Sequence, residues 1–109
     1  MSLPITVWKY PLELVDGPQL VLTHGINIRM VGNQRGAICV WIEGAQGLPE
    51  REKIPVEFFV VGTGHKVPYQ GEGPGLTELQ YAGSVISDPF VWHVYWRINL
   101  GRKQSGGVE

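Results

Sequence analysis

Two short segments carry most of the residues that could do chemistry. The first combines two glycines with a hydroxyl and an imidazole, in the order Val61-Gly62-Thr63-Gly64-His65. The second, residues 90–97, alternates apolar side chains with His93, Tyr95 and Arg97. Side chains two positions apart on a strand share one face, so these three polar side chains are predicted to be neighbours.

Both segments suit an anionic ligand. Glycines let backbone N–H groups approach a phosphate closely, and an arginine can pair with a phosphate or a carboxylate. Arg29, farther upstream, could supply a second cation, and Glu57 could balance a buried one. The predicted ligand site comprises Gly62, Thr63, Gly64, His65, His93, Tyr95, Arg97 and Arg29, with the loop at 66–77 as its rim. A purely structural interpretation also fits, in which the glycines relieve strain in a turn and the polar strand face meets solvent.

Metal and catalytic signatures are missing from the sequence. The histidines, His24, His65 and His93, lie in separate segments without the spacing of a zinc site. The only cysteine, Cys39, lies within an apolar run and is predicted to be a reduced, buried thiol. We therefore expect no metal, no cofactor and no catalytic residue. The alternative left open is a small hydrolase that uses His65 and His93.

The elements that must position these residues are strands. Apolar runs and alternation predict strands over residues 5–10, 20–22, 26–31, 38–42, 54–61, 79–86 and 90–98. The run 54–61 is apolar on both faces and is expected to be central, whereas Ile26, Ile28 and Met30 are expected to share one core-facing side. A helical turn fits residues 49–53. With no sustained helical period, the chain is predicted to be all-β, with an antiparallel sheet closed as a barrel or folded as a sandwich.

Length and composition limit the class of protein. The 109 residues suit one domain over residues 1–100, followed by a tail at 101–109 that is predicted to be disordered. Nine basic against ten acidic residues, without a basic stripe, argue against duplex nucleic acid as a partner. No run approaches a membrane span, and a lone cysteine suits a reducing cytoplasm. An exposed Trp41 or Tyr10 and an edge strand ending at Pro11 predict a homo-oligomer, most simply a two-fold dimer.

A set of short motifs resembles a family of small proteins encoded by bacteriophages and prophages. The motifs are Trp8-Lys9-Tyr10-Pro11-Leu12, Cys39-Val40-Trp41, Val61-Gly62-Thr63-Gly64-His65, Tyr81-Ala82-Gly83 and Phe90-Val91-Trp92-His93-Val94-Tyr95. The family carries a domain of unknown function, so the resemblance implies a phage origin and the host cell cytoplasm but supplies no catalytic residues.

By analogy with small phage accessory proteins, we expect a non-catalytic protein that sequesters a small phosphorylated or nucleotide-like ligand and so counteracts a host defence signal. The main alternative is an inhibitor that binds a host protein. A ligand pocket predicts that Gly64, His65 and Arg97 converge on a concavity, whereas a protein-binding module predicts a flat apolar patch. The pocket further predicts that Arg97→Ala abolishes binding without unfolding the protein.

Overall fold

A computed structural model describes residues 4–67 and 75–101 of the chain. The expected rim loop at 66–77 lies largely outside these residues, and the expected tail at 101–109 almost wholly so. The elements are β1 (Ile5–Leu12), β2 (Gln19–Thr23), β3 (Asn27–Gln34), β4 (Ala37–Ala45), the 3₁₀ turn η1 (Glu50–Glu52), β5 (Ile54–Gly62), β6 (Gln80–Ser87) and β7 (Phe90–Ile98).

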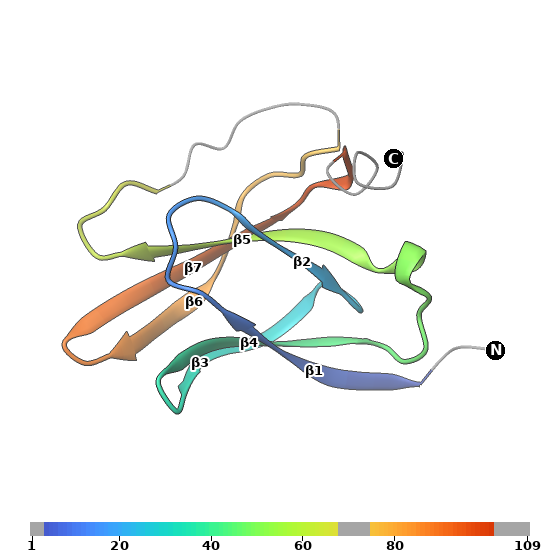
Figure 1. Ribbon diagram of the computed structural model, residues 1–109, viewed down its shortest axis with the longest axis horizontal. Helices are drawn as coiled ribbons and strands as arrows, with labels where there is room; N and C mark the ends of the chain where they lie inside the picture. The colour runs from blue at the N-terminus through green and yellow to red at the C-terminus, as the bar shows by residue number, and fades with distance from the viewer. Residues whose placement is uncertain (1–3, 68–74, 102–109) are drawn as a thin grey trace.

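The strands form two antiparallel sheets (Figure 1). One sheet has the order β1-β4-β3, and the other has the order β2-β5-β7-β6. The predicted all-β, antiparallel class is therefore confirmed, as is the central place of β5, which pairs with both β2 and β7. The sheets are not closed as a barrel, so that alternative is wrong.

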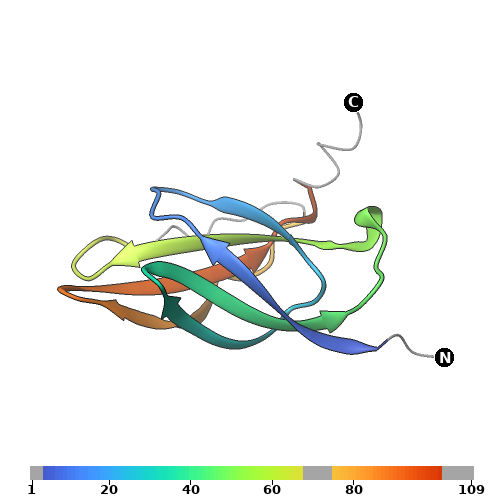
Figure 2. The same ribbon diagram turned by 60° about the horizontal axis from the view of Figure 1, so that its bottom comes forward.

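The two sheets lie as layers over a shared apolar core (Figure 2). Alternate residues of β4 point inward, as the sequence pattern predicts, and meet side chains of β5, β6 and β7. The buried members are Leu12, Ile38, Val40, Ile42, Val56, Phe58, Val85 and Val94. Burying apolar side chains on both inner faces gives a sandwich-like arrangement with one core.

β3 departs from the predicted alternation. Its register against β4 shifts between Ile28 and Met30, which is a β-bulge. An extra residue reverses which side chains face inward, so Ile28 and Val31 pack against the core. Met30 is 53% exposed and Ile26 is 44% exposed, so the predicted inward face of Ile26, Ile28 and Met30 is wrong for two of the three.

The chain crosses from one sheet to the other immediately after β2. There the His24 carbonyl accepts a hydrogen bond from the Ala45 N–H at 3.1 Å. A Cβ at Gly44 would overlap this carbonyl and lie 2.7 Å from the Cβ of His24, and a Cβ at Gly25 would lie 2.9 Å from the Cα of Gly44. Two backbones touch here, and only glycine leaves the room they need.

Candidate functional site

The segment from Gly62 to His65 is a tight turn at the end of β5. The His65 N–H donates to the Gly62 carbonyl at 3.1 Å, and Gly64 has a φ of 90°. A positive φ at the third position of a β-turn favours glycine. The Thr63 N–H donates to the Val91 carbonyl at 3.3 Å. Two of the amides that were expected to cradle an anion are thus occupied by the protein itself.

Side chains on the outer face of β5, β6 and β7 form a hydrogen-bonded chain through His93. The Thr63 hydroxyl donates to the Val91 carbonyl at 3.3 Å and lies 2.9 Å from Nε2 of His93. Because that hydroxyl donates to Val91, it accepts from Nε2–H, and Nδ1 is left to accept from the Ser84 hydroxyl at 2.7 Å. Ser84 is in turn hydrogen-bonded to the Tyr81 hydroxyl. This chain orients the His93 ring and the Thr63 hydroxyl.

The site predicted from the sequence includes Thr63 and His93 but omits Tyr81 and Ser84. Residues three apart on a regular strand point to opposite faces. A register shift between Tyr81 and Gly83 places Tyr81 and Ser84 on the same face. The Tyr81-Ala82-Gly83 motif is visible in the sequence. The bulge that lets Tyr81 reach Ser84 is not.

Arg97 lies apart from the turn and is already paired. Its Nε is 2.9 Å from Oε1 of Glu57, and the two side chains are 14% and 3% exposed. Glu57 also accepts from Asn99 at 3.1 Å, and the guanidinium lies 5.3 Å from the ring centre of Phe59. Glu57 therefore does balance a buried cation, as predicted, and that cation is Arg97.

The predicted residues therefore divide into separate groups. His93 pairs across from Val61, whereas Arg97 pairs across from Glu57. Four residues along a strand correspond to about 13 Å, so Arg97 does not converge with the turn. Tyr95 lies between them, packed in a second apolar cluster with Phe59, Val61 and Leu79.

Arg29 is on the other sheet altogether. It extends from β3, where its Nε lies 3.5 Å from Oε1 of Glu43. The outer face of the three-stranded sheet is on the opposite side of the core from the outer face that carries His93. The structure does not bring Arg29 to the other predicted ligand residues.

A hollow of about 410 Å³ lies at the end of the four-stranded sheet, between the turn and the start of β7. Its lining comprises Gly62, Thr63, His65, Pro89, Phe90, Val91 and Trp92. The Phe90 side chain is 60% exposed, and its ring lies 5.9 Å from that of Trp92. The volume falls in the range of about 300–1,000 Å³ that is usual for small-molecule sites.

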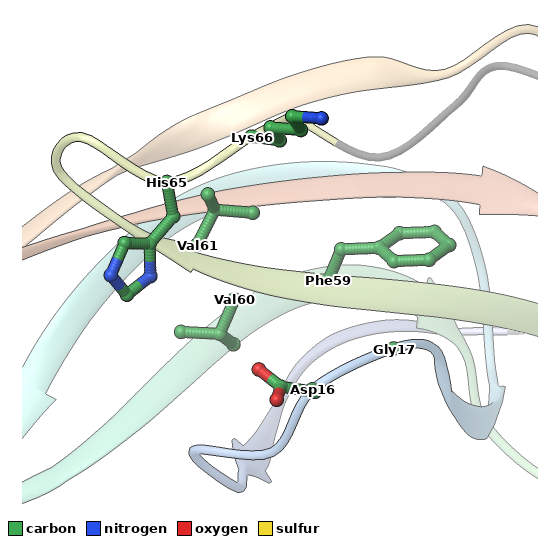
Figure 3. A pocket seen from close by; sticks show the side chains of 7 residues that line it. All are labelled: Asp16, Gly17, Phe59, Val60, Val61, His65 and Lys66. Atoms are coloured by element: carbon green, nitrogen blue, oxygen red, sulfur yellow. The ribbon is translucent and has the colours of Figure 1, made fainter.

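His65 also borders a smaller hollow of about 230 Å³, which Figure 3 shows. In this view the His65 ring lies at the left and the Asp16 carboxylate at the bottom, while Lys66 lies at the top and points away from both. This volume is below the usual range for small-molecule sites. The hollow of about 410 Å³ is therefore the better candidate for a small-molecule site.

A third hollow, of about 370 Å³, lies on the three-stranded sheet and carries positive charge. Lys9 and Arg35 line it, and Nζ of Lys9 donates to Oε1 of Gln34 at 2.5 Å. Cys39 is at its base, only 2% exposed and free, as predicted for a buried thiol. Sequence reasoning missed this pair of cations because they come from distant segments.

His24 belongs to an aromatic cluster that the sequence did not predict. Its ring stacks on that of Trp8 at 3.9 Å between ring centres. The Tyr10 hydroxyl oxygen lies 2.7 Å from Nδ1 of His24. The same oxygen accepts a hydrogen bond from the backbone N–H of His24 at 3.0 Å. Burial lowers the pKa of His24, the charge of Lys53 lowers it further, and Glu50 opposes both.

The lowered pKa of His24 predicts that acid destabilises the fold. A folded-state pKa below the unfolded value, about 6.5, means that the unfolded chain binds the proton more readily. The free energy of unfolding should therefore be highest above about pH 6.5 and should fall as the pH is lowered through the folded-state pKa. Urea unfolding of wild type and His24→Gln between pH 5 and 8 tests this. If the free energy of unfolding falls equally steeply with decreasing pH in the variant, the pH dependence belongs to groups other than His24.

Two further observations concern the described residues alone. Within 4–67 and 75–101, no three His, Cys, Asp or Glu side chains are placed to hold a metal ion together. No helix in this part of the chain is both long and apolar enough to cross a bilayer.

A comparison with protein families finds a match to the domain of unknown function DUF7352 over residues 4–104. The match agrees with the resemblance to a family that carries such a domain, while a phage origin stays a prediction. No curated protein and no solved structure matches the chain.

Proposed function

The chain belongs to the DUF7352 family, and we propose that it is a non-catalytic protein that binds a small nucleotide-like ligand. The proposed site is the hollow between the turn at Gly62–His65 and the start of β7. The observation that carries the proposal is the lining of this hollow, which brings two aromatic side chains together with an imidazole and a hydroxyl.

The aromatic side suits a base. Phe90 and Trp92 are tilted against each other by 45°, and Phe90 leaves more than half of its surface open. Stacking of a base on an aromatic side chain contributes about 1–3 kcal/mol and tolerates different bases. An exposed phenylalanine beside a tryptophan is thus a platform for a planar ligand.

The polar part of the lining suits a polar or anionic group. The His93 chain holds the Thr63 hydroxyl in one orientation, and His65 comes from the same turn. These groups replace Arg97 and Arg29, which are paired with carboxylates elsewhere. Withholding a signalling nucleotide in a host cell is the role proposed for such a site, and the phage setting of that role rests on the sequence resemblance.

Truncating Phe90 should weaken ligand binding without unfolding the protein. A thermal-shift panel would contain AMP, its 3′,5′-cyclic form, other linear and cyclic nucleotides, adenosine and inorganic phosphate. A ligand present at 100 times its Kd adds about 2.7 kcal/mol to the stability of the wild type. Phe90→Ala should lose about 1–3 kcal/mol of binding free energy, because it removes one stacking surface.

The matched control is Ile86→Ala, on the same hairpin. Ile86 is 72% exposed and lies outside the lining of the hollow, so its truncation should leave every shift unchanged. His65→Ala should weaken binding of the nucleotides more than that of adenosine. Equal shifts in wild type and Phe90→Ala, or a loss of binding on Lys9→Gln and Arg35→Gln only, would contradict the proposed site.

The order of hydrogen bonds at His93 favours one second candidate, a small hydrolase. A serine hydroxyl that donates to an imidazole nitrogen is the arrangement of an activated nucleophile, and Ser84 stands in this relation to His93. In that case, chromatography would recover a hydrolysed ligand, and Ser84→Ala would stop the conversion. Recovery of the ligand unchanged supports binding alone.

A further inference from the structure

β1 leaves one of its two edges unpaired in the described structure, because it is the outermost strand of the order β1-β4-β3. The Pro4 carbonyl accepts from the Gln46 N–H at 3.0 Å and therefore points toward the β4 side. Backbone groups of alternate residues point to opposite edges of a strand. The N–H and C=O groups of Ile5, Val7 and Lys9 consequently point away from β4.

This free edge has little of the protection that natural edge strands usually carry. Lys9 is its only charged residue, and Pro11, which has no N–H, stands at the far end of the outward-pointing set. The side chains of Ile5 and Val7 are 66% and 51% exposed. Three consecutive outward residues can thus both donate and accept.

We propose that β1 pairs with β1 of a second copy of this chain, antiparallel and around a two-fold axis at Val7. In this register each Val7 faces the Val7 of the partner subunit, and Ile5 faces the partner's Lys9. All three outward residues then exchange backbone hydrogen bonds, and Pro11 lies beyond the paired segment. The two three-stranded sheets become one continuous sheet.

The axis at Val7 is the one that pairs all three outward residues with one another, and charge separation excludes the axis at Lys9. Centring the axis on Lys9 would set two ammonium groups directly opposite each other, which is unfavourable. Centring it on Val7 separates the two lysines by four positions, about 13 Å along the strands. A second copy presents the same three outward donors and acceptors at the same spacing as this edge.

The apolar side chains near the edge support the same partner. Val7 and Lys9 pair in register with Glu43 and Trp41 of β4, and Trp41 pairs with the exposed Met30. The pairing would extend this partly apolar face across the two-fold axis. It would also bring Val7 against its equivalent and Ile5 against the aliphatic stem of the partner's Lys9.

Cysteine cross-linking tests the register directly. Residues facing each other in a hydrogen-bonded antiparallel pair have Cα atoms about 5.5 Å apart, within the range of about 4.4–6.8 Å for a disulfide. Val7→Cys should therefore form a covalent dimer under mild oxidation, twice the 12.1 kDa mass of the chain. Ile5→Cys, whose equivalents lie four positions apart, should stay uncross-linked, and native Cys39 is buried in both.

Light scattering of the full chain tests the backbone hydrogen bonds. Wild type and Val7→Thr, which keeps the N–H, should have twice the mass of one chain at micromolar concentration. Val7→Pro should have the mass of one chain, because it removes the donor at the axis. Val7→Lys places like charges opposite each other and should also have the mass of one chain. This second variant keeps the test valid if Val7→Pro fails to fold. A monomeric wild type, a dimeric Val7→Lys, or cross-linking of Ile5→Cys but not Val7→Cys would each overturn the proposal.

Discussion

Gly44→Ala is expected to destabilise the protein strongly, because the added methyl group has backbone atoms as its nearest neighbours. The new Cβ would overlap the carbonyl of His24, where one strand connection crosses β4. Overpacking a core side chain typically costs about 1–3 kcal/mol, and here the obstacle is backbone, so we expect a loss above about 3 kcal/mol. Urea unfolding monitored by tryptophan fluorescence measures it.

Gly32→Ala is the matched control within the same sheet. A Cβ there would lie 3.4 Å from the ring of Trp41 and 3.5 Å from the end of Met30, and both of these are side chains that can adjust. Its effect on the free energy of unfolding should be below about 1 kcal/mol, since it is an ordinary strand substitution. Comparable losses in the two variants would show that the crossing at His24 tolerates movement.

Arg97→Ala should also destabilise the fold strongly, which revises the expectation that this change affects binding alone. It would leave Glu57, which is 3% exposed, without the guanidinium that lies 2.9 Å away. Removing one partner of a buried ion pair typically costs about 3–5 kcal/mol, because the other charge stays buried. Chemical unfolding at a fixed neutral pH gives the value.

The double variant Glu57→Leu with Arg97→Leu separates this effect from lost packing. Replacing both members of a buried pair by apolar residues is often close to neutral. The double variant should therefore be more stable than Arg97→Ala. The cycle completed by the single variants Glu57→Leu and Arg97→Leu should show coupling between the two positions. A double variant that is the less stable of the two would mean that the pair itself stabilises the fold.

The fold was largely readable from local pattern. Alternation of Ile38, Val40 and Ile42 fixed one inward face, and the apolar run of β5 fixed the centre of the larger sheet. The choice between a barrel and two open sheets was not readable. It depends on which distant strands pair, such as β1 with β4, and no local pattern records that choice.

The site was less predictable because it depends on bulges and on strand ends. The bulge in β6 places Tyr81 beside Ser84, and neither residue type nor spacing signals it. Arg97 was predicted to bind the ligand because its partner, Glu57, lies 40 positions away in the sequence. No local pattern shows that the two side chains pair. The alternation of the sequence predicts Phe90 on an apolar strand face, whereas the structure leaves it exposed at the start of β7.

The most direct test of the central claim is an NMR titration of the ¹⁵N-labelled protein with AMP. The proposed site predicts that amide signals of residues 62–65 and 90–92 move together and saturate with one Kd. Signals around Lys9 and Arg35, at the cationic hollow on the other sheet, should stay in place. Shifts confined to the cationic hollow, or no saturable shift with AMP or any other nucleotide of the panel, would contradict the account.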